Sequence, residues 1–354
     1  MFKIIKYSLY FVLVLIASFC GFIGYMTYSD YTPAQKESII SDNRIADTLQ
    51  IGKPLKMLTW NIGYAGLDSA MDFFYDGGHQ VRPTESQVLK NMHFIGDYLS
   101  CQSDSTDFML IEEIDKNSKR SYYRNQIDTF IGKMEGYKAY FAKNYSVKWV
   151  PIPITDPMGS VESGVALLTN RSPISVTRYA FPFNFDWPLS VFMLDRCFLC
   201  NRYPTSDGKQ LVLIVTHNSA FDSDGHLRKA ELNYFKKFLL REYAEGNYVI
   251  AGGDYNQCPA KFDPCPFGKL FNRNDFHTIP DSLFPSSWHF VYDGHTPSNR
   301  EVIAPYHPNS TKVTVIDFFI TSPNVKTIGV KTDNLEFSNS DHNPVRATFV
   351  LEGN

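Results

Sequence analysis

The chain after residue 55 alternates between short apolar runs and stretches with helical periodicity. The apolar runs predict buried strands at 56–60, 108–111, 164–169, 211–216, 248–251, 313–316 and 345–350. The sequence TESQ at 84–87 is a capping box, and it predicts a helix whose apolar residues Val88, Met92, Ile95 and Leu99 share one face. Two further helices are predicted, one ending at Gly136 and one over 226–243, and a turn at 205–208 predicts a hairpin. This alternation favours an α/β architecture over a helical bundle.

The N-terminal segment has a different pattern, because residues 7–29 contain no charged side chain. Such a stretch is long enough to cross a bilayer as a helix. Lys3 and Lys6 precede it and Asp30 follows it, so the positive-inside rule places the rest of the chain outside the cytoplasm, in the periplasm or the extracellular space. A cleaved signal peptide is the alternative, although its apolar stretch is usually shorter. We therefore expect a transmembrane anchor or signal-anchor over residues 1–28.

Residues 29–54 are polar and aperiodic, and they are interpreted as a stalk between the anchor and one large domain over 55–352. A hydrophobic content of 44% with 15% aromatic residues excludes a disordered chain. The formal net charge of −3 excludes a basic protein that binds nucleic acid through bulk electrostatics, although a local basic groove stays open. No sequence feature indicates an oligomer, and we expect a monomer.

Five of the six cysteines lie beyond the apolar segment. Cys197 and Cys200 form a CxxC motif without a second such motif, which makes a structural zinc site a poor interpretation. Cys258 and Cys265 flank a proline-bearing loop, where they either close a short disulfide in an oxidising compartment or stay as thiols. The remaining cysteine, Cys101, has no partner that the sequence identifies.

Polar side chains stand where several predicted strands end. These residues are Asn61, Glu113, His217, Asp254, Asn256, Asp341 and His342. Strand ends in layered α/β folds project side chains into a common crevice, so we expect this set to converge. Asp317 differs because it interrupts the apolar run at 313–320, and a buried carboxylate costs several kcal/mol unless it is paired. His342 is the partner that we expect for it.

These residues fall within sequence blocks that resemble the endonuclease/exonuclease/phosphatase superfamily, which includes DNase I-like nucleases, neutral sphingomyelinases and inositol polyphosphate 5-phosphatases. The blocks are TWN at 59–61, IEEI at 111–114, GVALL at 164–168, THN at 216–218, GDYN at 253–256, VID at 315–317 and SDH at 340–342. The resemblance spans nearly all of residues 55–350. It implies a four-layer sandwich in which two packed mixed β-sheets carry helices on both outer faces.

The resemblance also implies roles for the residues at strand ends. Glu113, Asn61 and Asp341 would form a Mg²⁺ site, with Mn²⁺ as a substitute, since Mg²⁺ prefers oxygen ligands. Asp254 would orient or deprotonate the attacking water, while Asn256 would hold phosphate oxygens. His342, kept protonated by Asp317, would place positive charge against the transition state. His217 would contact the phosphate and protonate the leaving group.

The substrate is a phosphodiester or phosphomonoester whose identity stays open. Inositol 5-phosphatases carry tryptophan two residues before the glycine of the GDxN block, and this chain has Ala251 there, which disfavours that class. The membrane anchor favours a lipid headgroup, as in sphingomyelinases, or a small molecule over nucleic acid. A nuclease and a non-catalytic binding protein with the same fold are the alternatives. The apolar loops at 149–154 and 181–187 either face lipid or fold over the core.

Overall fold

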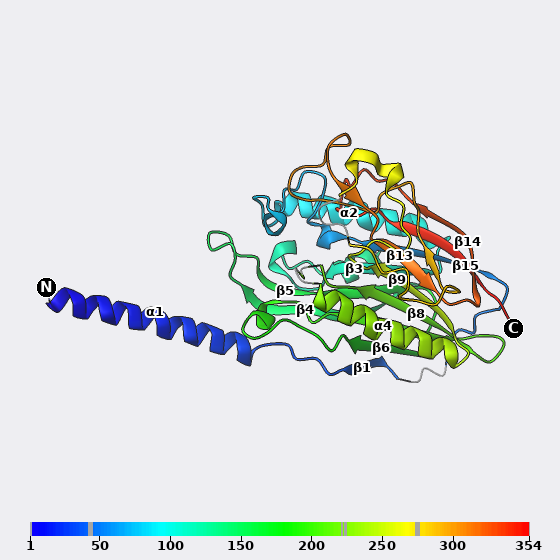
Figure 1. Ribbon diagram of the computed structural model, residues 1–354, viewed down its shortest axis with the longest axis horizontal. Helices are drawn as coiled ribbons and strands as arrows, with labels where there is room; N and C mark the ends of the chain where they lie inside the picture. Colours follow the sequence, from blue (N-terminus) through cyan, green and yellow to red (C-terminus); the bar gives the residue numbers. More distant parts are fainter. Residues whose placement is uncertain (1, 42–44, 221, 223–224, 273–276, 354) are drawn as a thin grey trace.

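The computed structural model describes residues 2–41, 45–220, 222, 225–272 and 277–353. Over these ranges the chain forms two packed mixed β-sheets with helices on both outer faces, preceded by a long apolar helix (Figure 1). This architecture confirms the predicted fold class.

In the described part of the chain, the first sheet contains seven strands in the order β1-β6-β7-β8-β9-β13-β10. Their bounds are β1 Lys36–Ile40, β6 Ser175–Ala180, β7 Cys197–Pro204, β8 Gln210–His217, β9 Tyr248–Asp254, β13 Asp317–Thr321 and β10 His289–Val291. Neighbouring strands are antiparallel except β8 and β9, which are parallel. The hairpin predicted around residues 205–208 joins β7 to β8 and is confirmed.

Within the same described ranges, the second sheet contains six strands in the order β14-β15-β2-β3-β5-β4. Their bounds are β14 Val325–Thr332, β15 Val345–Leu351, β2 Pro54–Asn61, β3 Phe108–Asp115, β5 Gly159–Thr169 and β4 Lys138–Val150. Again one central pair, β2 and β3, is parallel and the others are antiparallel. A separate ribbon pairs β11 (Asn299–Arg300) with β12 (Val313–Thr314).

Apolar side chains fill three layers, and this explains why the central strands are apolar at nearly every position. In β8, Leu211 and Leu213 face the core between the sheets, whereas Val212 and Ile214 face helix α4 (His226–Ala244). In the other sheet, the helices α2 (Glu85–Ser103) and α3 (Gln126–Ile131) cover the outer face. Because both faces of each sheet are covered, the strands show apolar runs instead of alternation.

The helices begin and end close to the predicted positions. The Thr84 side chain accepts a hydrogen bond from the Gln87 backbone amide, as expected of the N-cap of α2. Helix α3 ends at Ile131, earlier than predicted, and the chain continues through turns to Gly136, whose φ is +75°. Short 3₁₀ turns complete the elements: η1 Gly63–Ala65, η2 Phe74–Asp76, η3 Lys119–Ser121, η4 Leu189–Phe192 and η5 Cys265–Leu270.

Helix α1 (Phe2–Tyr28) extends away from the sheets, is exposed along most of its length, and is long and apolar enough to cross a membrane (Figure 1). The segment after it differs from the predicted stalk. Strand β1 lies within that segment and pairs with β6 at the edge of the first sheet. Leu49 is also buried between the sheets. The sheets therefore include residues before the predicted boundary near Leu55.

The cysteines give two structural results. Cys197 faces the core between the sheets and Cys200 faces the α4 side, because residues three apart on a strand point to opposite faces. Their CxxC motif therefore cannot gather both sulfur atoms around one metal. Cys258 is a buried free thiol, so it does not form the disulfide with Cys265 that the sequence allowed.

Candidate active site

The strands β2, β3, β8 and β9 all end at one edge of the two sheets, and the chain places its polar strand-end residues there. Asn61 ends β2, Glu113 lies near the end of β3, and His217 and Asp254 end β8 and β9. The parallel pairing inside each sheet aligns these ends. Hydrogen bonds and close ion pairs link all eight residues predicted for the site: Asn61, Glu113, His217, Asp254, Asn256, Asp317, Asp341 and His342.

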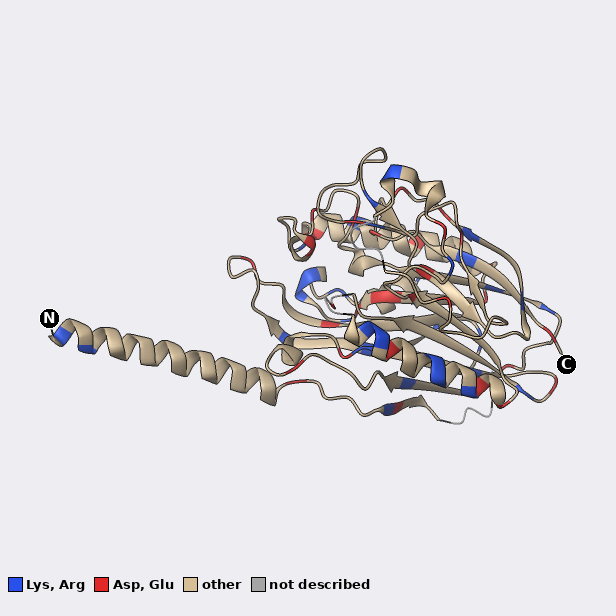
Figure 2. Ribbon diagram, viewed as in Figure 1, with Lys and Arg blue, Asp and Glu red and all other residues tan. Residues whose placement is uncertain are grey.

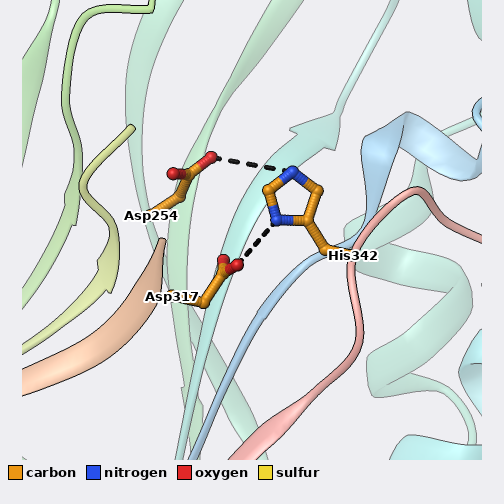
Figure 3. Close-up of side chains that lie close together, drawn as sticks. All are labelled: Asp254, Asp317 and His342. Carbon is orange, nitrogen blue, oxygen red and sulfur yellow. Dashed lines mark hydrogen bonds and ion pairs between the residues drawn. The ribbon is translucent and has the colours of Figure 1, made fainter. Parts of the chain in front are cut away.

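Asp254, Asp317 and His342 form the first part of the site, which we call the imidazole group. The His342 ring lies between the two carboxylates (Figure 3). Its Nδ1 is 2.8 Å from Asp317 Oδ2, and its Nε2 is 3.8 Å from Asp254 Oδ2. The predicted partnership of Asp317 and His342 is thus confirmed. Ser298 completes it, since its hydroxyl donates to Asp317 Oδ2 at 2.7 Å.

The electrostatics of the imidazole group favour a protonated ring. Burial alone would lower the pKa of His342, but the Asp317 and Asp341 carboxylates and the hydrogen bond to Asp317 outweigh it and hold that pKa well above its ordinary value. Burial raises the pKa of Asp254 to about 7, and the nearby Asp317 carboxylate adds to the shift. This group therefore holds a protonated ring beside a carboxyl group whose pKa is about 7.

Asn61, Glu113 and Asp341 form the second part, the oxygen group. The Asn61 amide donates to Glu113 Oε1 at 3.4 Å and to Asp254 Oδ2 at 3.0 Å, so it joins the two groups. Burial raises the pKa of Asp341 to about 6, and the neighbouring Glu113 charge contributes. Among the described residues, neither Glu113 nor Asp341 forms an ion pair with a lysine or an arginine. The charges of His342 and Arg300 lower the pKa of Asp341 but do not offset its burial, so the ionised oxygen group favours an added cation.

Glu113 reaches this position through an irregularity in β3. The pairing of β3 with β5 shifts register between Ile111 and Ile114, and Glu113 has a φ of +52°. Such a bulge re-aims a side chain, and a non-glycine residue in the left-handed region is strained by about 1–3 kcal/mol. Its neighbour Glu112 is fully buried instead, and burial raises its pKa well above the ordinary value. Only one of the two adjacent glutamates thus serves the site.

The chemistry of the oxygen group fits a hard divalent cation. Two carboxylates and an amide are the ligands that Mg²⁺ prefers, and a cation would relieve the raised pKa of Asp341. Asp254, Asp317 and His342 also offer ligand atoms within 4.8 Å of one another. However, a histidine ligand must be deprotonated to bind a metal, and His342 holds its proton between two carboxylates. We therefore assign the oxygen group as the candidate metal site.

His217 faces both groups, with its Nε2 atom 3.6 Å from Asp254 Oδ2 and 3.9 Å from Glu113 Oε1. Burial lowers its pKa well below the ordinary value, and the charges of Arg196 and His342 lower it further. The ring is therefore neutral in the free protein and suits a hydrogen bond to phosphate better than proton donation. Asn256 lies at the rim, where its amide donates to the Asn218 carbonyl.

Several residues of the site were not found in the sequence. Arg196 is buried, donates to the His217 carbonyl at 3.4 Å, and lies near enough to Glu113 and Asp254 for their charges to act on its pKa. Arg196 stands directly before the apolar run of β7, and this position at a strand start is the sequence signal that could have identified Arg196 as a site residue. Ser298 has no such signal, because it precedes a strand of two residues.

The fold is similar to that of several solved structures. An endonuclease/exonuclease/phosphatase from Beutenbergia cavernae is 15% identical with a TM-score of 0.57, and the match covers 85% of this chain and 72% of that chain. ANGEL2, a 2′,3′-cyclic phosphatase solved with adenosine-2′,3′-vanadate, is 14% identical with a TM-score of 0.52, covering 91% and 100%. Truncated Caenorhabditis elegans TDP2 is 15% identical with a TM-score of 0.50, covering 85% and 98%. At these identities the similarity concerns the fold alone.

No curated protein sequence matches the chain. The family comparison is decisive, because the model of the Endonuclease/Exonuclease/phosphatase family matches residues 58–342 and so covers both groups of the site. This protein belongs to the endonuclease/exonuclease/phosphatase family.

Proposed function

We propose that the chain is a membrane-anchored, Mg²⁺-dependent phosphoesterase whose substrate is a phosphate ester in a lipid headgroup. Members of its family are typically hydrolases that act on phosphoester bonds. The proposal rests on one observation, which is that the oxygen group and the imidazole group meet at Asp254. Asn61 of the oxygen group donates to one oxygen of this carboxylate, and His342 lies 3.8 Å from the same oxygen. A cation site and a protonated imidazole thus flank one general base.

In this proposal Asp254 orients and deprotonates the attacking water. A base with a pKa of about 7 is well matched to proton transfer near neutral pH. The protonated His342 stabilises the charge that develops on the phosphoryl oxygens, and Asp317 fixes the orientation of its ring. The buried Arg196 and the neutral His217 provide further donors for those oxygens.

The metal has one role in the proposal. A divalent ion held by Asn61, Glu113 and Asp341 would polarise the phosphoryl oxygen and stabilise the departing oxygen. The protein supplies the ligands and the charge that attracts the ion, while the water is handled by Asp254. The separation of these tasks explains why the oxygen group contains no histidine.

The N-terminal helix supports the finer part of the proposal. Helix α1 has the length and apolarity of a membrane span, and the basic residues Lys3 and Lys6 lie before it. The positive-inside rule then places the catalytic domain outside the cytoplasm. A domain joined to the bilayer by a few residues meets lipid headgroups at high local concentration, which favours a lipid substrate over a soluble polymer.

The full chain in detergent should hydrolyse phosphate esters in a metal-dependent way. We would compare bis-p-nitrophenyl phosphate, sphingomyelin, inositol phosphates and plasmid DNA with Mg²⁺, with Mn²⁺ and with EDTA. Hydrolysis of the generic diester that EDTA abolishes is the expected result, and sphingomyelin should be cleaved fastest in mixed micelles. Hydrolysis that persists in EDTA would remove the metal from the proposal. A clear preference for plasmid DNA would replace the lipid headgroup with nucleic acid.

A further inference from the structure

The membrane-side end of the domain is defined by contacts between α1 and one loop. The Trp187 indole donates to Thr27 Oγ1 at 3.1 Å, and the rings of Phe22 and Phe192 stack with centroids 6.0 Å apart. Met26 is buried by the same contacts. The loop over residues 181–194 therefore lies where α1 ends, within a few side chains of the membrane surface if the helix spans the bilayer.

A second loop shares this apolar cluster. Residues 151–158 connect β4 to β5, and their flanking side chains Val150 and Met158 pack in one cluster with Met26 and Val191. Figure 1 shows this connection projecting on the side of the domain from which α1 extends. The bases of the two loops and the helix end thus pack in one apolar cluster, although they are far apart in the sequence.

Large apolar side chains on these loops point away from the core. Ile154 is 90% exposed and Trp187 is 64% exposed, and four others share this property. We call the set the apolar rim: Trp149, Ile152, Ile154, Phe183, Trp187 and Leu189. Exposed apolar side chains that gather in one region indicate an interaction or membrane site, and tryptophan is enriched at membrane interfaces. The loop bases thus pack on the core, while the six side chains of the apolar rim stay 40–90% exposed among the described residues.

Strand directions place the apolar rim at the catalytic edge. Both β4 and β3 are antiparallel to β5, so β4 ends at the same edge as Glu113. Both β6 and β8 are antiparallel to β7, so the loop after β6 leaves from the same edge as His217. The pocket beneath this loop is lined by Phe183 and Met193 and also by Arg196 of the site. The loop over residues 181–194 therefore borders the site at Arg196, and the loop over residues 151–158 leaves from the same edge.

We infer that the apolar rim inserts into the interfacial layer of the bilayer that α1 crosses, and that it holds the catalytic edge against the lipid headgroups. The inference rests on the membrane anchoring in the proposed function and deepens its lipid substrate. Tryptophan and aliphatic side chains favour the headgroup boundary, where apolar area is buried without complete loss of hydration. The contacts of Trp187 and Phe192 with α1 orient the domain, so that insertion of the loops requires no rearrangement.

Tryptophan fluorescence of the full chain in phosphatidylcholine nanodiscs tests the insertion. The chain has four tryptophans, of which Trp60 and Trp288 are buried in the domain. Lipids brominated near the headgroup should quench roughly half of the emission, because two of the four indoles lie on the rim. Trp149→Phe and Trp187→Phe should each remove part of the quenched component. Equal emission in brominated and ordinary lipid would overturn the inference.

Substitution of the loop tips tests the consequence for catalysis. Ile154→Glu and Leu189→Glu should slow hydrolysis of a phospholipid in the bilayer by about threefold to tenfold each. Hydrolysis of bis-p-nitrophenyl phosphate should keep the wild-type rate. The matched control is Ile328→Glu, because Ile328 is 57% exposed on β14, at the opposite end of the domain from α1 (Figure 1). This control should leave both rates unchanged.

The outcomes separate this inference from the proposed function. A wild-type chain that cleaves the soluble diester while the rim variants cleave the bilayer substrate normally would overturn the inference and leave the phosphoesterase intact. Quenching with no hydrolysis of any ester would support the rim and remove the proposed activity. A rim that a second copy or another protein covers would show no quenching, and Ile154→Glu would then change the oligomeric state, which overturns the inference.

Discussion

The two halves of the site differ in how completely the protein satisfies their charges. In the imidazole group, Asp317 accepts hydrogen bonds from Ser298 and His342, and the His342 ring lies between the Asp317 and Asp254 carboxylates (Figure 3). In the oxygen group, the charges of Glu113 and Asp341 repel each other, and the positive charges of His342 and Arg300 do not offset the burial of Asp341. The imidazole group therefore has a hydrogen-bonded counter-charge from the protein, whereas the oxygen group would gain more from a bound cation.

The distribution of charged residues shows whether the negative charge of the oxygen group belongs to a larger acidic region. Figure 2 shows acidic and basic residues scattered over the domain, while α1 has basic residues only near its start. The negative charge of the oxygen group is therefore a local arrangement and not part of an acidic surface.

The largest effect should come from His342→Ala, which removes the protonated ring of the imidazole group. Turnover of bis-p-nitrophenyl phosphate should fall by about 10²–10⁴-fold, because a positioned cation and its proton are lost from the transition state. Since the ring is not a metal ligand in our assignment, added Mg²⁺ should not restore the rate. We would measure kcat over a Mg²⁺ titration, with a melting curve to confirm folding.

A different result would change the assignment. Recovery of His342→Ala at high Mg²⁺ would show that the ring binds the metal, and Asp254, Asp317 and His342 would then be the metal site. If His342→Ala kept the wild-type rate at every Mg²⁺ concentration, the imidazole group would have no part in the reaction.

A smaller effect is expected from Glu113→Gln, which weakens the oxygen group. The apparent Mg²⁺ affinity should fall by about 10–100-fold, and saturating metal should recover part of the rate. The matched control is Glu112→Gln in the adjacent position. Glu112 is buried, burial raises its pKa well above the ordinary value, and its hydrogen bond from Thr59 can pass to an amide oxygen. Titration curves that coincide for the two variants would contradict the assignment of Glu113.

Much of the fold and of the site could be predicted because both depend on patterns of burial. Strands covered on two faces must be apolar throughout, so β3, β8 and β9 are visible as runs. The pairing of Asp317 with His342 was predicted from the cost of a carboxylate in an apolar run. The structure brings the predicted strand-end residues together, while their roles in a reaction stay predictions.

Other features of the structure leave no pattern of apolar and polar residues in the sequence. Strand β1 joins the sheet at its edge through backbone hydrogen bonds, and its side chains are mostly exposed, so the segment resembled a stalk. The left-handed conformation of Glu113 follows from the register of β5, which local sequence does not encode. Ser298 comes close to Asp317 only through tertiary packing. These three features thus depend on backbone pairing and long-range contacts, and for this reason the residue pattern could not predict them.

The smallest expected effect concerns the stability of the metal-free protein, where the two groups should respond differently to the loss of a charge. Burial raises the pKa of Asp341 from its ordinary 3.8 to about 6. Because the folded-state pKa is the higher one, the favourable contribution of this group is complete below about pH 4 and is lost as the pH rises through 6. In EDTA at pH 8, Asp341→Asn should therefore raise the free energy of unfolding by about 1–3 kcal/mol, and the gain should vanish near pH 4.

The comparison variant is Asp254→Asn, which should gain little although the pKa of Asp254 is also raised, to about 7. This carboxylate accepts from the Asn256 backbone amide at 2.8 Å and from the Asn61 side chain at 3.0 Å, and an amide cannot accept both bonds. Loss of one buried hydrogen bond, about 1 kcal/mol, offsets the removed charge. Thermal melts at pH 4, 6 and 8 distinguish the two. If Asp341→Asn melts no higher than the wild type at pH 8, its carboxylate is already neutralised and the oxygen group does not require a cation.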